Sequence, residues 1–193
     1  MHAMTKRRFA YFSGFILLIA ILFILSIYLA GYIAESDVAQ EIVGRFGYFG
    51  IILLGIVGGF NLLVPVPAAT FTPIFVASGF STFGIIAGLA IGTTVADLIS
   101  YYVGAIGKHY SGFPESPLYE KIHTIREKHS KLLVPFIFLY ASFAPYPNEA
   151  MIVPLAFMGM RMRTFILPVL IGNTTYNTVL VLGISGIIEF LKF

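Results

Sequence analysis

Residues 61–80 read NLLVPVPAATFTPIFVASGF, and residues 141–160 read ASFAPYPNEAMIVPLAFMGM. Both stretches are largely apolar, and each is interrupted by a Pro-X-Pro turn. As a helix, the 13 residues 68–80 after the first turn would extend only about 20 Å, whereas the hydrocarbon core of a bilayer is about 30 Å thick. The apolar run 151–160 after the second turn is also too short to cross. The pattern favours a re-entrant hairpin, which enters the membrane and returns, over two tilted spans joined by a tight turn.

The two stretches belong to an internal repeat with an offset of 80 residues. Without a gap, this shift pairs the following landmarks: Pro65 with Pro145, Pro67 with Pro147, Gly79 with Gly159, Gly92 with Gly172, and Thr94 with Thr174. The same shift places Asp97 on Asn177. Because one full span separates the two copies, we expect them to be inverted relative to each other.

The composition indicates an integral membrane protein. Of the 193 residues, 58% are hydrophobic and 11% are charged, whereas about 25% of the residues of a soluble domain are charged. A soluble fold of this size would have too little polar surface to cover itself. Continuous apolar runs favour helices over a barrel. We therefore expect an all-α integral membrane protein with inverted repeats, each a re-entrant helical hairpin followed by a transmembrane helix, plus an N-terminal transmembrane helix.

Residues 1–193 are expected to form a single membrane domain. Its expected segments are a transmembrane helix at 9–34, a re-entrant hairpin at 46–80, a transmembrane helix at 82–107, a cytoplasmic loop with an amphipathic helix at 108–131, a second hairpin at 132–160 and a transmembrane helix at 164–188. All but two of the 12 Lys and Arg residues, Arg45 and Lys192, then lie on one side. The positive-inside rule places that side and the N-terminus in the cytoplasm, as in a multi-pass protein of the cell (plasma) membrane. Because the charges cluster at the ends of apolar segments, we expect no nucleic-acid partner.

Two acidic residues lie at membrane depth, where a carboxylate is costly to bury and is functional by default. Glu149 follows the second Pro turn beside Asn148, where it would face a cavity and bind a cation, a proton or a lipid amine. The alternative is that Glu149 only caps a helix start, a place that favours acids. Asp97 lies inside the central span, and its alternative role is a structural hydrogen bond to Tyr101, Thr93 or the opposite helix.

Further polar residues are assigned to the same substrate or proton path. In the last span, Asn173 and Asn177 form a polar band with Thr174 and Thr175, either as cavity lining or as hydrogen bonds between helices. Asn61 and Ser142, one in each hairpin, complete the set. The histidines show no metal-ligand spacing and the chain has no cysteine, so we expect no metal and no cofactor.

Small residues recur at every fourth position of the central span, among them Gly84, Gly88 and Gly92. Such a stripe lets another helix backbone approach closely. It indicates packing, either inside one chain or between two copies in a homo-oligomer, and it says nothing about chemistry.

Much of the chain, about residues 46–188, resembles a known family. The run LLVPVPAATFTPIFVASGF after Asn61, followed by a Gly-rich span to YYVGAIGK, is similar to the first half of a DedA-family protein, of the VTT or SNARE-associated Golgi protein superfamily. The run KHSKLLVPFIFLYASFAPYPNEAMIVPLAFMGMRMRTFILPVLIGNTTYNTVL is similar to the second half. The resemblance implies two hairpins that face each other in inverted repeats. It also implies movement of polyprenyl-phosphate carriers or phospholipids between leaflets, linked in some members to proton motive force.

The chain departs from the family pattern in its hairpins. Bacterial members carry an acid after the first Pro pair, where Ala69 stands here, and often two arginines where Ser142 and Asn148 stand. Those arginines suit a phosphate headgroup, so their absence argues against a phosphate-carrier flippase. The run PYPN resembles instead the Pro-Asn signature of the scramblase branch, and Glu149 supplies the acid on the second hairpin.

These observations predict a membrane lipid transporter, a flippase or scramblase, with membrane lipids as partners and proton coupling as an option. The alternative is a proton- or ion-coupled transporter of a small solute, which has the same architecture. An enzyme is not expected, because the sequence has no Ser/His/Asp set and no HExxH motif. A structural or assembly subunit is the remaining hypothesis.

Overall fold

The computed structural model describes residues 17, 21, 24–26, 28–60, 66–110, 130–144 and 146–191. Within these residues the protein is all-α and contains no sheet. The helices in chain order are α2 (Asp37–Gly59), the 3-10 helix η1 (Ala68–Phe71), α3 (Thr72–Ala77), α4 (Thr82–Tyr110), α6 (Ser130–Phe143), α7 (Glu149–Phe157) and α8 (Met162–Leu191).

Three of these helices are long and apolar enough to cross a membrane, which suggests a multi-pass membrane protein. The qualifying segments are Asp37–Gly59, Thr82–Lys108 and Met162–Ile187. Most of the expected N-terminal span at 9–34 and the expected amphipathic helix within 108–131 lie outside the described residues.

Helix α2 begins at Asp37 rather than at residue 46, where the first hairpin was expected to begin. The Ser36 hydroxyl caps the helix by accepting a 3.4 Å hydrogen bond from the Ala39 N–H, and Asp37 in the first turn complements the helix dipole. The helix is interrupted at Gly47, whose φ of 59° and ψ of −155° are not helical. Only glycine adopts this backbone conformation without strain, so the sequence permits a kink at this point.

The short helices of the two halves end in the same turn, in keeping with the offset of 80 residues. Gly79 has a φ of 87° and Gly159 a φ of 76°. After each glycine the next N–H reaches back five residues, from Phe80 to the Phe75 carbonyl at 3.1 Å and from Met160 to the Leu155 carbonyl at 3.0 Å. This is the Schellman ending of a helix, which redirects the chain into the long helix that follows.

The glycine stripe of α4 lies against α2. A Cβ at Gly92 would collide with the Ile52 carbonyl oxygen and would lie 2.7 Å from the Gly55 Cα. A Cβ at Gly88 would lie 2.9 Å from the Ile51 side chain, and one at Gly84 would collide with the Tyr48 ring. The two backbones therefore pack closely within one chain. The stripe needs no second copy to be buried.

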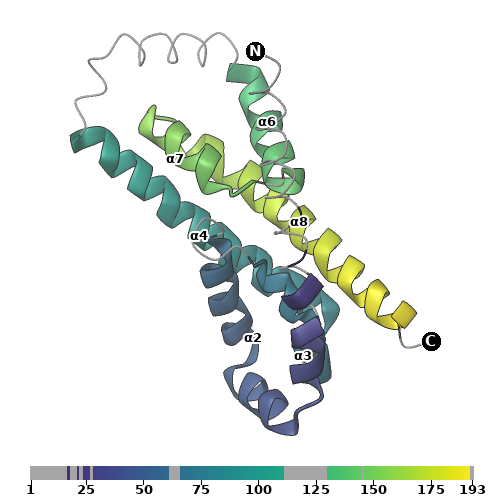
Figure 1. Ribbon diagram of the computed structural model, residues 1–193. Coiled ribbons are helices and arrows are strands. Elements are labelled where there is room, and N and C mark those ends of the chain that lie inside the picture. The colour runs from purple at the N-terminus through teal and green to yellow at the C-terminus, as the bar shows by residue number, and fades with distance from the viewer. Residues whose placement is uncertain are drawn as a thin grey trace, which may run out of the picture.

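Each short helix packs against the long helix of the other half. Ala69 and Phe75, of η1 and α3, share a buried apolar cluster with Val181 and Ile184 of α8. In turn α7 packs on α4, where a Cβ at Gly104 would collide with the Val153 carbonyl oxygen. In Figure 1, α4 and α8 cross side by side, with α6 and α7 toward one end and α2 and α3 toward the other.

We predict that Gly92→Ala destabilises the protein by about 1–3 kcal/mol, because the added methyl group overpacks the contact between α2 and α4. Gly183→Ala is the matched control, since a Cβ at Gly183, on an exposed face of α8, meets nothing within 4 Å. Thermal unfolding in detergent, followed by circular dichroism, measures both. Equal midpoints for the two variants would contradict the packing described.

Candidate functional site

Asp97 lies on α4, is only 1% exposed and is the centre of a buried hydrogen-bond network. Its Oδ2 accepts a hydrogen bond from Asn173 Nδ2 at 2.7 Å and another from Asn148 Nδ2 at 3.1 Å. Asn173 lies on α8, and Asn148 directly precedes α7. One carboxylate oxygen thus ties together a long helix of each half and the start of a short helix.

The two amide groups use their remaining N–H bonds within the same network. Asn148 Nδ2 also donates to Asn173 Oδ1 at 3.1 Å, and Asn173 Nδ2 also donates to Thr94 Oγ1 at 3.1 Å. We call Thr94, Asp97, Asn148 and Asn173 the polar cluster. All four side chains are buried, so their hydrogen bonds form in surroundings where an unmade bond is costly.

The second carboxylate oxygen of Asp97, Oδ1, is buried and has no hydrogen-bond partner among the described residues. A buried acceptor left unsatisfied costs about 1–3 kcal/mol, and more when it is charged. The atom is therefore a position at which a proton, a water molecule or a donor group of a ligand would be stabilised.

Glu149 is the first residue of α7, next to Asn148, and only 8% of its surface is exposed. It directly follows Asn148, whose Nδ2 donates to Asp97 Oδ2 at 3.1 Å. Two acidic side chains are therefore buried near one another at the start of α7. The position of Glu149 in the first turn also complements the helix dipole, so the capping role and the path role are compatible.

A second cross-helix contact is the repeat-related counterpart of the first. Asn177 Nδ2 lies 3.3 Å from Thr93 Oγ1 and also donates to the Asn173 carbonyl oxygen at 2.8 Å. The offset of 80 residues maps Asp97 onto Asn177 and Thr93 onto Asn173. The contact between Asp97 and Asn173 thus recurs with other side chains between Asn177 and Thr93.

The two short-helix starts differ chemically, although the turns that end these helices correspond. At the offset of 80 residues, Ala68 and Ala69 take the places of Asn148 and Glu149. Both alanines are buried in the apolar cluster with α8. The start of the second short helix therefore carries an amide and a carboxyl group. The first carries two alanines at these places, and its buried Thr70 and Thr72 hydroxyls bond to backbone carbonyls three residues earlier.

The other expected path residues do not join the polar cluster. Ser142 is buried, but its hydroxyl donates to the Phe138 carbonyl of its own helix at 2.7 Å. Thr174 and Thr175 likewise bond to carbonyls one turn earlier in α8. Asn61 lies outside the described residues, as do Pro65 and Pro145.

The two described turn prolines each support the helix that follows. The Pro67 carbonyl accepts hydrogen bonds from Thr70 N and Thr70 Oγ1, and the Pro147 carbonyl accepts one from Ala150 N. Tyr140 on α6 also donates to the Pro147 carbonyl at 3.4 Å, which joins the two arms of the second expected hairpin.

Of the three partners expected for a structural hydrogen bond of Asp97, the structure shows the one on the opposite helix. The partner is Asn173 on α8, whereas the Tyr101 hydroxyl donates to the Met160 carbonyl at 2.7 Å. The sequence marks Thr94 only as a landmark of the repeat, and the structure adds it to the polar cluster. Its position three residues before Asp97, on the same helical face, is the signal that would have found it.

Within the described part of the chain, no group of three or more His, Cys, Asp or Glu side chains is arranged to hold a metal ion. Comparison with family models, curated proteins and solved structures finds no match to this chain.

We predict that Asn173→Leu destabilises the protein by about 1–3 kcal/mol, because it removes the shorter of the two hydrogen bonds to the buried Asp97 carboxylate. Asn177→Leu should cost about 1 kcal/mol or less, since Thr93 keeps its bonds to the Leu89 and Ala90 carbonyls. Unfolding midpoints in detergent compare the two. An unchanged midpoint for Asn173→Leu would show that Asp97 does not depend on Asn173.

Proposed function

We propose that this protein is a lipid transporter, a flippase or scramblase that moves phospholipid or polyprenyl-phosphate lipid between membrane leaflets. The observation that carries the proposal is the polar cluster. Asp97 and Glu149 are buried beside two amides in a chain of which 58% is hydrophobic. Burying carboxylates among transmembrane-length helices is costly, and such residues typically line a path for substrates or ions.

We further propose that the two halves are inverted repeats, each with a re-entrant hairpin. In the second half, helices α6 and α7 have 14 and 9 residues, or about 21 Å and 14 Å, which is too short to cross a bilayer. In the first half, α2 is long enough to cross as a whole, but its kink at Gly47 leaves residues 48–59 as an arm of only about 18 Å. Two features support this arrangement. The short helices of the two halves end in the same turn, and each short helix packs against the long helix of the other half. The protein would then be a multi-pass protein of the plasma membrane with a cytoplasmic N-terminus, as the positive-inside rule indicates.

The similarity of both runs to the DedA family supports lipid as the substrate class. Within the class, an amine-bearing headgroup fits better than a bare phosphate. No arginine or lysine side chain contributes to the polar cluster as described, whereas the two carboxyl groups would attract a cationic amine. The protein acts by binding and passage, with no enzymatic step.

One observation favours the second candidate, a proton- or ion-coupled transporter of a small solute. Asp97 is 1% exposed, and its Oδ1 has no hydrogen-bond partner among the residues that the structure describes, a geometry that suits a proton or a small cation better than a whole headgroup. A transport assay distinguishes the two candidate functions, because a lipid moves in the first and a small solute in the second.

We predict that single cysteines at positions 66 and 146 react slowly with a membrane-impermeant maleimide from either side, because both tips lie inside the membrane. The chain contains no native cysteine, so each label is unambiguous. Ser36→Cys, at the start of α2, is the fast-reacting control. Rapid labelling of both tips, from opposite faces, would refute the hairpins and leave two full spans in each half.

We predict that liposomes containing the purified protein and a fluorescent phosphatidylethanolamine bleach well beyond half on addition of dithionite, which reaches only the outer leaflet. Glu149→Gln and Asp97→Asn should slow the excess bleaching about tenfold or more, because each removes a buried charge from the path. Thr178→Ala is the matched control, since its hydroxyl donates within its own helix α8, to the Thr174 carbonyl.

Two results would count against the lipid proposal. Bleaching that stops at half with the wild-type protein would exclude passive phospholipid exchange. Equal rates for the wild type and both acid variants would remove the polar cluster from the path and favour a structural role for it.

A further inference from the structure

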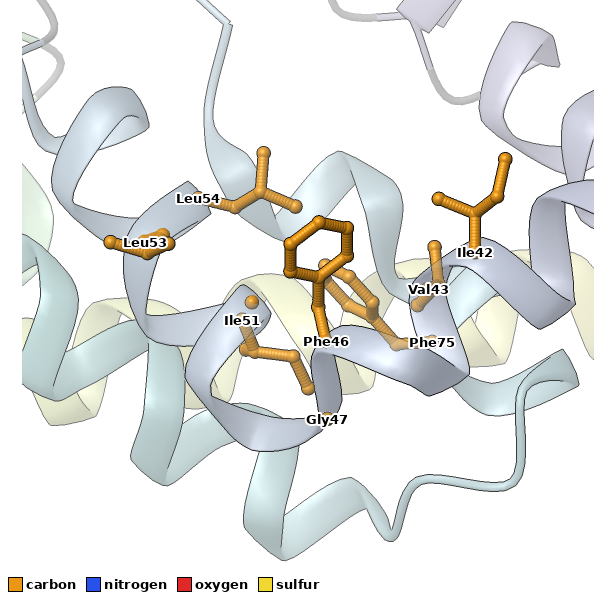
Figure 2. Close-up of a pocket in the computed structure, with 9 residues that line it drawn as sticks. Ile42, Val43, Phe46, Gly47, Ile51, Leu53, Leu54 and Phe75 are labelled. Carbon is orange, nitrogen blue, oxygen red and sulfur yellow. The ribbon is translucent and has the colours of Figure 1, made fainter.

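The kink in α2 opens a second site, away from the polar cluster. At Gly47 a pocket of about 290 Å³ forms between the two parts of the helix. Eight of the nine lining residues come from α2, and Phe75 of α3 is the ninth (Figure 2). The polar cluster, in contrast, belongs to α4, α8 and the start of α7.

The pocket has an apolar lining and an open side. Each of the nine described lining residues is aliphatic, aromatic or glycine, so none of their side chains offers a hydrogen bond. Figure 2 shows Ile42 and Val43 on one side of the Phe46 ring and Leu53 and Leu54 on the other. Phe75 is only 1% exposed, whereas Phe46 is 60% exposed. The pocket thus extends from the buried contact of α2 with α3 to the outer surface of α2.

The surroundings of α2 indicate what fills the pocket. This helix is one of the three candidate spans, and 22% of its apolar window is buried inside the protein. Among the described residues, most of its outer surface is therefore uncovered, and in a membrane that surface would face hydrocarbon. Water in the pocket would find no polar side-chain partner, and a cavity of this kind stays dry or takes up apolar molecules. An acyl chain of a neighbouring lipid matches the lining and is present at high concentration.

The charges beside the pocket indicate which headgroup accompanies the chain. Glu41 and Arg45 form an ion pair, with an N···O distance of 2.6 Å, in the same two turns of α2 as Ile42 and Phe46. Both side chains are more than half exposed, so they remain open to other partners. A guanidinium group complements a phosphate, and a carboxylate complements a primary amine. The pair therefore matches a zwitterionic amine phospholipid.

We propose that the pocket at the Gly47 kink holds one acyl chain of a phosphatidylethanolamine-type lipid as a resident lipid, whose headgroup lies on Glu41 and Arg45. This lipid is a bound component of the protein and is distinct from a transported molecule. The proposal stands on the pocket and the ion pair, and it does not depend on transport through the polar cluster.

The first test is native mass spectrometry of the protein extracted in a mild non-ionic detergent from vesicles that contain phosphatidylethanolamine. The wild type should carry one phospholipid. Val43→Trp, which fills the pocket, should lower the bound fraction about tenfold. Val57→Trp is the matched control, because it adds the same ring to the same helix at an exposed site outside the pocket and should retain the lipid. Arg45→Gln should weaken retention more for phosphatidylethanolamine than for uncharged diacylglycerol.

A second measurement uses the wild-type chain, so it does not depend on whether a variant folds. The protein is extracted from vesicles containing phosphatidylethanolamine with a diazirine in its acyl chain, and it is illuminated after the bulk lipid has been removed. Adducts should concentrate on α2 between Ile42 and Leu54 and on Phe75.

Three results would overturn the proposal. These are equal lipid retention by Val43→Trp and Val57→Trp, adducts spread evenly over the outer faces of α4 and α8, and a wild-type protein that carries no lipid. The last result would assign the pocket to another segment of the chain or to a second copy.

Discussion

The structure depends on one requirement, namely that one oxygen of the buried Asp97 carboxylate finds hydrogen-bond donors inside an apolar protein. Its Oδ2 obtains two N–H donors, one from α8 and one from the residue before α7. Losing either donor exposes a buried acceptor to an environment that cannot replace it. The relative positions of α4, α8 and the second short helix are therefore linked through a single oxygen atom. The same requirement places Glu149 next to the network, because it follows Asn148 directly in the chain.

The two halves share a backbone plan but differ in chemistry. The helix-ending turns at Gly79 and Gly159 correspond, and the Asp97–Asn173 contact has a counterpart in Asn177 and Thr93. Yet the start of the first short helix carries two buried alanines. A neutral amide at Asn177 can use the carbonyl oxygens of its own helix, whereas a carboxylate at Asp97 needs donors from elsewhere. The polar tip of the second half supplies one of those donors, so the difference between the tips follows from the difference between the two side chains.

The sequence was sufficient to predict the features that rest on length and periodicity. Continuous apolar runs indicated two of the long helices, and the rarity of buried acids singled out Asp97 and Glu149. The kink in α2 was not predicted, because a glycine in an apolar run permits a kink without requiring one. The start of α2 at Asp37 was not predicted either, because a single capping residue, Ser36, is a weaker sign of a helix start than the beginning of an apolar run. Ser142 was assigned to the path by its type alone. A hydroxyl can satisfy itself on its own helix, and no sequence pattern distinguishes that choice from a contact across helices.

The packing of each short helix on the other half's long helix has a consequence for biogenesis. The first short helix, formed by η1 and α3, packs on α2, which precedes it, and on α8, which is synthesised about a hundred residues later. Part of its contact surface is therefore missing while the chain is being made. The second short helix is different, because α4 precedes it and is already in place. Assembly is therefore ordered, and the first half is completed only when the C-terminal helix arrives. A ribosome that stops before α8 releases a chain with Ala69 and Phe75 only partly covered, a species that quality-control proteases would recognise.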